Sequence, residues 1–366
     1  MPALNRRTFL QAALPALAFA PYAARADAPA VPIADMHSHF GILQRPSMPS
    51  VSFAADLRSQ HVALIAWAMP SDLRWTRLVE TGVAQSGEPE PGALRAFFSD
   101  RLGRMKAYVA RGGLRPVLAQ ADVDACVAGE SGVVLASEGA DFLEGRIETL
   151  GTFYDLGLRH LQLVHYIRNP IGDFQTVAPV HNGLSEAGKH LVEACNEKGI
   201  LVDLAHCSAA AVDQALAVTN TPVVWSHSWV DKTEGRWQDG VGYLQRRLSL
   251  DQAKKIAAAG GVVGLWGLGL PKPGPSRTPG EGNWTVGLGD RRGYARELAN
   301  LVNWIGADHV GIGTDMEGVG TAWSVNNYDH VRSVIEALQD MKLPASVIEQ
   351  VAYANYARVL RAALRR

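Results

Sequence analysis

The chain lacks the features that mark several large classes of protein. It has three cysteines in 366 residues, Cys126, Cys195 and Cys207, which is too few and too odd a number for a disulfide framework, and no CxxC pair occurs. We therefore expect buried thiols. Lysine and arginine total 35 against 36 acidic residues, so the formal charge of −1 shows none of the basic excess typical of nucleic-acid binding.

Long apolar runs are also missing after the first segment of the chain. No stretch beyond residue 28 approaches the about 18 uncharged apolar residues that a membrane-spanning helix needs, so we expect no membrane anchor. No internal repeat or low-complexity segment is present. With 47% hydrophobic and 19% charged side chains, the chain can bury a full core.

Residues 1–28 have the pattern of a secretory signal of the twin-arginine kind. The paired Arg6 and Arg7 precede a short apolar run, and small residues follow at Ala24, Ala26 and Ala28. This pattern predicts removal of the segment near Asp27 or Pro29 and a periplasmic location. The rest of the chain, residues 29–366, is then expected to be the folded domain.

Eight short runs rich in Val, Ile and Leu alternate with stretches of helical period. Such alternation is typical of parallel strands covered by helices. Eight strands at this rhythm predict a (β/α)8 barrel, the TIM barrel of the α/β class. An open doubly wound sheet is the alternative, but no GxGxxG follows the first strand. The expected strands are 31–36, 62–69, 132–138, 158–165, 199–206, 221–227, 260–268 and 308–315.

Local signals support the helical stretches between these runs. Ser185 and Ser249 stand where helix N-caps are expected, and Gly199 stands at the end of the first of these two helices. The Pro- and Gly-rich residues 271–284 predict a long loop beside the barrel mouth.

Ionisable residues stand at six of the expected strand ends. Active sites of such barrels form at the carboxyl ends of the strands, so these side chains are predicted to converge on one mouth. Imidazoles and carboxylates of this kind bind one or two divalent ions, most simply Zn²⁺, and Glu138 is the candidate for a bridging ligand. The residues are His37, His39, Glu138, His165, His206, His227 and Asp315. The remaining histidines, His309 among them, are expected to be structural.

Several segments resemble the membrane dipeptidase (renal dipeptidase) family of zinc peptidases, within the amidohydrolase-like barrels. Residues 183–228, GLSEAGKH through SHS, are the longest match, and DHVGIGTDMEG at 308–318 resembles another family segment. SEG at 137–139, LRHLQLVH at 158–165 and ANYARVL at 354–360 follow the same order and spacing.

The resemblance implies a role for each matching residue. His37 would bind the first metal, Glu138 would bridge, and His206 and His227 would bind the second metal. His165 would polarise the substrate carbonyl, and Asp315 would transfer the proton. Two zinc ions sharing a hydroxide would then hydrolyse the amide bond of a dipeptide, with a D-residue at its C-terminal position as one option.

Two departures from the family pattern matter. The family has H-x-D where this chain has His37-Ser38-His39, and a neutral imidazole in place of a carboxylate raises the net charge of the site and weakens retention of the first metal. The arginine that grips the substrate carboxylate aligns with Arg246, with Arg236 and Arg247 as rivals because the preceding segment is longer.

Other functions stay open at this point. The same ligands would serve an amidohydrolase acting on a lactone, a cyclic amide, an N-acyl amino acid or a phosphoester. A non-catalytic protein that captures a metal or peptide is a third reading, although His165 and Asp315 exceed what metal retention requires. The sequence leaves open whether the chain forms homodimers.

Overall fold

The structure is a computed structural model that describes residues 30–43, 52–79, 82–231, 245–267, 291–318 and 325–365. The predicted signal segment and the predicted loop at 271–284 lie outside the described residues, as does Arg236.

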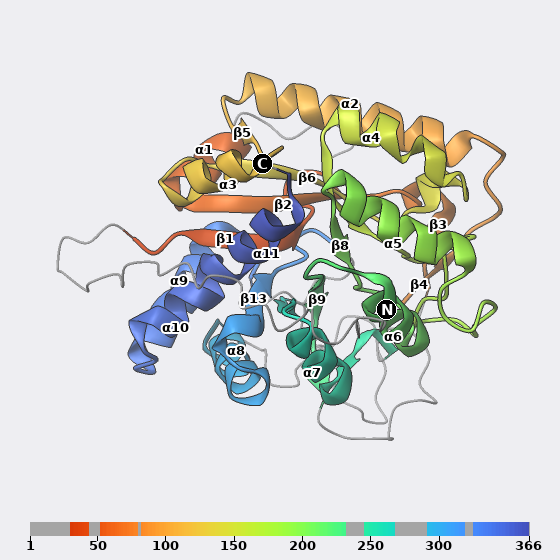
Figure 1. Ribbon diagram of the computed structural model, residues 1–366. Coiled ribbons are helices and arrows are strands. Elements are labelled where there is room, and N and C mark those ends of the chain that lie inside the picture. The colour runs from red at the N-terminus through yellow and green to blue at the C-terminus, as the bar shows by residue number, and fades with distance from the viewer. Residues whose placement is uncertain are drawn as a thin grey trace, which may run out of the picture.

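Eight parallel strands form a closed barrel, as the sequence predicted. Each strand pairs in parallel with its neighbours, and the pairing of β2 with β6 closes the ring. Figure 1 shows the helices arranged around these central strands. The barrel strands, in spatial order, are β1 (Ile33–Ser38), β2 (Val62–Pro70), β6 (Gly132–Glu138), β7 (Leu158–Gln162), β8 (Leu201–Asp203), β9 (Val224–Ser228), β12 (Val262–Trp266) and β13 (Val310–Gly313).

The helices of the described residues follow the strands in the expected alternation. Ser185 caps α5 by accepting a hydrogen bond from the Gly188 amide, and Ser249 caps α7 through the Gln252 amide, as predicted. None of the helices in the described ranges is both long and apolar enough to cross a membrane. They are α1 (Ser52–Ser59), α2 (Ala93–Arg111), α3 (Gln120–Val127), α4 (Leu150–Leu156), α5 (Glu186–Lys198), α6 (Ala209–Val218), α7 (Leu250–Ala258), α8 (Arg291–Ile305), α9 (Tyr328–Asp340), α10 (Ala345–Glu349) and α11 (Asn355–Ala363).

The apolar core has an inner and an outer part. The outer part packs the helices on the strands, whereas the inner part fills the barrel and includes Tyr356, Val359 and Leu360 of α11. Helix α11 contacts β1, β8, β12 and β13. All three cysteines are buried and unpaired, which confirms the expectation of buried thiols.

Several predicted boundaries were wrong by a few residues. Strand β7 ends at Gln162 and β8 at Asp203, so His165 and His206 lie on the loops that follow these strands. Short pieces that the sequence reading missed are β3 (Thr76–Val79), β4 (Gly82–Gln85), β5 (Arg115–Pro116), β10 (Val230–Asp231) and β11 (Leu248–Ser249). Of these, β3 and β4 form an antiparallel hairpin after β2.

Close backbone approach beneath the mouth requires glycine at Gly313. A Cβ added there would lie 1.7 Å from the Ser226 carbonyl oxygen and 3.3 Å from the Cα of His227. We expect Gly313→Ala to lower the free energy of unfolding by about 3 kcal/mol, because the rigid strands must separate. The control is Gly103→Ala within α2, where an added Cβ meets no described atom within 4 Å. It should raise stability by about 0.5–1 kcal/mol. Urea denaturation of both variants measures the difference, and equal midpoints would refute the steric argument.

Candidate metal centre at the barrel mouth

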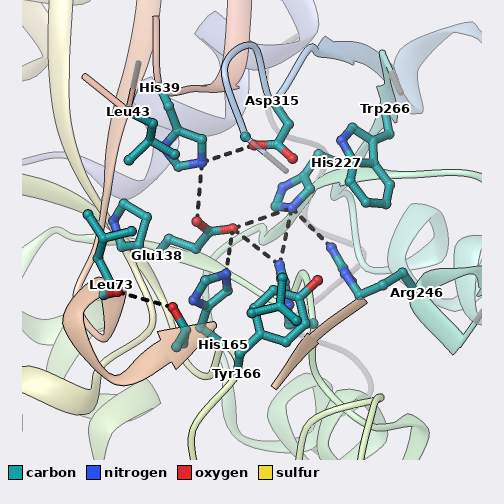
Figure 2. Close-up of a pocket in the computed structure, with 15 residues that line it drawn as sticks. His39, Leu43, Leu73, Glu138, His165, Tyr166, His227, Arg246, Trp266 and Asp315 are labelled. Carbon is teal, nitrogen blue, oxygen red and sulfur yellow. Dashed lines mark hydrogen bonds and ion pairs between the residues drawn. The ribbon is translucent and has the colours of Figure 1, made fainter. Parts of the chain in front are cut away.

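The seven predicted ionisable residues come together at the carboxyl end of the barrel. His37 lies in β1, Glu138 is the last residue of β6 and His227 lies in β9. The other four follow their strands directly or after a short turn. All seven side chains are nearly buried, with exposed fractions of 7% or less. Figure 2 shows Glu138 at the centre of this cluster.

Two of these residues have a backbone conformation that side chains disfavour. His206 has φ 70° and Asp315 has φ 51°, both in the left-handed region. Such a conformation costs about 1–3 kcal/mol and persists where the surrounding structure enforces it, often at functional sites. With these conformations His206 Nε2 lies 3.2 Å from Glu138 Oε1, and Asp315 Oδ1 lies 2.9 Å from His39 Nε2.

The ligand atoms form two groups that share one carboxylate. His37, His39, Glu138 and Asp315 make up the first group, and Glu138, His206 and His227 the second; within each group the ligand atoms lie within 4.8 Å of one another. Glu138 Oε2 is 3.2 Å from His39 Nε2, while Glu138 Oε1 is 3.2 Å from His206 Nε2. Oε1 also lies 3.4 Å from His37 Nε2 of the first group, so the carboxylate contacts members of both groups, which fits a bridging ligand.

The first group fits a cation because its carboxylate oxygens are acceptors and its imidazole nitrogens can offer lone pairs to a metal. His39 Nδ1 lies 2.8 Å from the Ala68 carbonyl oxygen, so Nδ1 carries a ring proton. His39 Nε2 faces Asp315 Oδ1, 2.9 Å away, and Glu138. Although burial alone would lower it, the two carboxylates raise the pKa of His39 well above its usual value. A bound divalent ion would satisfy all three atoms.

The second group carries neutral imidazoles, the form that binds metal. Arg246 can only donate, and its Nη2 lies 3.0 Å from His227 Nε2, so that nitrogen holds a lone pair. Burial, and next to it the neighbouring His37 imidazole and Arg246 guanidinium, lower the pKa of His227 well below its usual value. Burial and Arg246 do the same for His206.

Glu138 keeps its charge despite its burial. Burial would raise the pKa of its carboxyl, but His165, His37 and His39 outweigh this effect and hold it well below the usual range. A buried carboxylate surrounded by imidazole nitrogens is a ligand set suited to borderline divalent ions such as zinc.

His165 and Arg246 lie on either side of the two groups. His165 Nε2 is 3.3 Å from Glu138 Oε1, and its Nδ1 is 2.7 Å from Asp72 Oδ1. Burial opposes a charge on His165, yet Asp72 and Glu138 raise its pKa to about 10. Arg246 is completely buried and donates to Gln175 Oε1 at 2.6 Å. It reaches the site, whereas Arg247 is not among the residues that line the pocket.

One pocket is lined by the members of both groups other than His37, and by His165 and Arg246. Apolar side chains from the β3–β4 region line one part of it, and Trp266 lies near Arg246 and His227. Figure 2 places Leu43 and Leu73 across Glu138 from Arg246 and Trp266. The sequence reading missed Asp72, Gln175, Tyr166 and Trp266.

Two histidines that were expected to be structural, His160 and His309, lie outside the two ligand groups. His160 is buried inside the barrel, where its Nδ1 lies 3.0 Å from the Tyr356 hydroxyl and its Nε2 3.3 Å from Asp203. His309 precedes β13, at the opposite end of the barrel, and its Nδ1 lies 2.9 Å from the Gly261 carbonyl oxygen.

The fold and the paired ligand groups define a metal-dependent hydrolase of the TIM-barrel type. Residues 99–365 match the family model of membrane dipeptidases, peptidase family M19, and the chain belongs to that family. The matched residues include six of the eight site residues, while His37 and His39 precede them.

Individual relatives agree with this assignment. Dipeptidase tcpJ of Claviceps purpurea is 26% identical over 239 residues, which are 64% of this chain and 51% of that protein. The chain thus spans about half the length of this curated relative. The crystal structure of dipeptidase AC, a metallopeptidase of family M19, has a TM-score of 0.71 at 20% identity, covering 92% of this chain and all of that one. A metallopeptidase from Rhodobacter sphaeroides, solved with a phosphinate mimic of L-Ala-D-Ala, has a TM-score of 0.70 at 19% identity, with 92% and 100% covered.

Proposed function

We propose that this chain is a zinc-dependent dipeptidase with two metal ions per molecule. The observation that carries the proposal is the shared position of Glu138 between two groups of ligand atoms. Membership of the dipeptidase family supports the reaction type, and the dipeptide mimic bound to the Rhodobacter sphaeroides relative supports the substrate class. The paired Arg6 and Arg7 favour export to the periplasm as part of the same proposal.

The residues around the two ligand groups have different roles in amide hydrolysis. When bound, divalent ions would supply Lewis-acid activation of water and of the substrate carbonyl. His165 directs Nε2 into the pocket, where it binds the carbonyl oxygen and stabilises the negative charge that develops there. Asp315 accepts the proton of the attacking water and returns it to the leaving amine.

Arg246 binds the free carboxylate at the C-terminal end of the substrate. Its guanidinium is buried at the pocket wall beside Trp266, with Gln175 holding Nη1. A buried guanidinium binds a carboxylate in two parallel hydrogen bonds. The pocket therefore suits a dipeptide with a free carboxylate, and an N-acyl amino acid presents the same group. Lactones and phosphoesters do not present it.

The test combines metal removal with a matched pair of substrates. Chelation should abolish dipeptide hydrolysis, and zinc should restore it, because the two groups of ligand atoms would hold the ions that activate the water. A C-terminally amidated dipeptide should have kcat/KM about 10²-fold lower than the free acid, since it loses a charge-assisted hydrogen bond to Arg246. Metal content and a ninhydrin-type amine assay measure both effects. Bound metal without turnover on any amide would favour a binding protein instead.

A further inference from the structure

Strand pairing does not account for the orientation of the His165 ring. Strand β7 ends at Gln162, so His165 stands on a loop, where backbone pairing does not fix the ring. Its Nε2 nevertheless faces the pocket, 3.3 Å from Glu138 Oε1. The shortest polar contact of the ring is on the opposite side, from Nδ1 to Asp72 Oδ1 at 2.7 Å.

Asp72 holds both the ring and the backbone of this loop. While Oδ1 contacts the imidazole, Oδ2 accepts a hydrogen bond from the Tyr166 amide at 3.0 Å. One carboxylate therefore fixes the side chain of His165 and the peptide that follows it. Asp72 is completely buried and does not line the pocket, so it cannot touch a substrate there.

The turn that carries Asp72 is tied to the backbone of Glu138. The Ser71 amide donates to the Glu138 carbonyl oxygen at 2.9 Å, and the Trp75 amide donates to the Asp72 carbonyl oxygen at 2.7 Å. Asp72, Glu138 and His165 therefore share one rigid frame although they follow three different strands. Such a carboxylate–imidazole contact orients the ring and selects the nitrogen that carries the proton.

A second buried carboxyl group, that of Asp141, contacts the turn that carries Asp72. Asp141 accepts from the Ser71 hydroxyl at 2.8 Å and from Asn169 Nδ2 at 2.7 Å, without contacting His165. Burial and the charge of Asp72 raise the pKa of Asp141 to about 7. In neutral solution much of Asp141 is therefore protonated, and an asparagine there closely mimics it.

We propose that Asp72 is a positioning residue that acts through His165, aiming Nε2 at the carbonyl oxygen of the bound substrate. The proposal rests on the proposed dipeptidase function only for its kinetic consequence. Because Asp72 touches His165 and no substrate, its removal impairs the step that His165 assists and leaves substrate affinity and metal ligands in place.

A double-mutant cycle on the metal-loaded full chain tests this role. We expect Asp72→Asn to lower kcat about 10²-fold and to change KM less than about threefold. In a His165→Gln background the same substitution should lower kcat less than about threefold, because the partner through which it acts is gone. Asp141→Asn is the matched control, an isosteric change in the same buried network that should leave kcat within about threefold of the parent.

Two further readouts separate folding and function from positioning. Metal content and the thermal midpoint of each variant identify any that fails to fold, and Asp72→Glu then replaces Asp72→Asn, with partial recovery of kcat expected. The NMR signal of the His165 Nδ1 proton should be present in the parent and lost in Asp72→Asn, whether or not dipeptides are substrates. Unchanged kcat in Asp72→Asn, or equal losses in both backgrounds of the cycle, would overturn the proposal. A parent chain without dipeptidase activity would instead count against the proposed function.

Discussion

Replacing Glu138 by glutamine is expected to remove bound metal from both groups and to lower turnover by about 10³-fold or more, since loss of metal-assisted charge stabilisation removes several kcal/mol. The carboxylate is the single member common to the two groups. Glutamine has nearly the same shape but carries no charge, so two neighbouring divalent ions would lose the anion that offsets their repulsion.

The effect of Glu138→Gln on metal binding should exceed that of any single histidine. Five imidazole Nε2 atoms, those of His37, His39, His165, His206 and His227, lie between 3.2 and 3.6 Å from its carboxylate oxygens. Metal analysis and kcat on the same preparation measure the outcome. Glu349→Gln is the control, because Glu349 is also buried and accepts a hydrogen bond from Tyr353 at 2.7 Å away from the site. Two metal ions per chain retained in Glu138→Gln would contradict the bridging role.

The barrel and its ligand residues could be predicted from the sequence for a physical reason. Parallel strands buried on both faces are continuous apolar runs, and all eight such runs correspond to barrel strands. A closed parallel barrel places the carboxyl ends of its strands at one mouth. Ionisable residues at those ends therefore meet, although Glu138 and Asp315 are far apart along the chain.

The supporting residues could not be predicted in this way. Asp72 follows a turn after β2, and its partner His165 lies on a loop after β7, so their 2.7 Å contact depends on how two loops pack. The spacing of apolar residues along the sequence does not indicate how two loops pack against each other. Gln175, which holds Arg246, lies likewise in a segment without regular structure. His165 and His206 were predicted as strand residues for a similar reason, because an apolar run does not indicate at which residue strand pairing stops.

The structure places a carboxylate next to the second histidine of the H-x-H motif. The sequence predicted that an imidazole at His39 leaves the first group one negative charge short of the family pattern. Asp315 Oδ1 lies 2.9 Å from His39 Nε2, so a second carboxylate stands within the first group. Asp315 already belongs to the segment that resembles the family, so it does not replace the charge that the motif lacks, but it places a carboxylate beside the imidazole that stands there. This position gives Asp315 two possible contributions, as a ligand and as a proton acceptor.

Asp315→Asn should therefore lower kcat by about 10³-fold, because a carboxamide cannot accept the proton of the attacking water. The second group should keep its metal, since Asp315 is not a member of it. This distinguishes the variant from Glu138→Gln, in which both metals are expected to leave. Turnover and metal ions per chain, measured together on dialysed protein, separate the two cases.

The metal content of Asp315→Asn also divides the two contributions of this residue. Two ions per chain with little turnover would mean that Asp315 acts in proton transfer, whereas one ion would mean that it also holds the first metal. Asp308→Asn is the matched control, because Asp308 is exposed and precedes the same strand at the opposite end of the barrel. Parental kcat in Asp315→Asn would exclude Asp315 from the reaction. The strained φ of 51° at this residue would then need another cause, since packing alone gives the chain no reason to hold a buried carboxylate against His39.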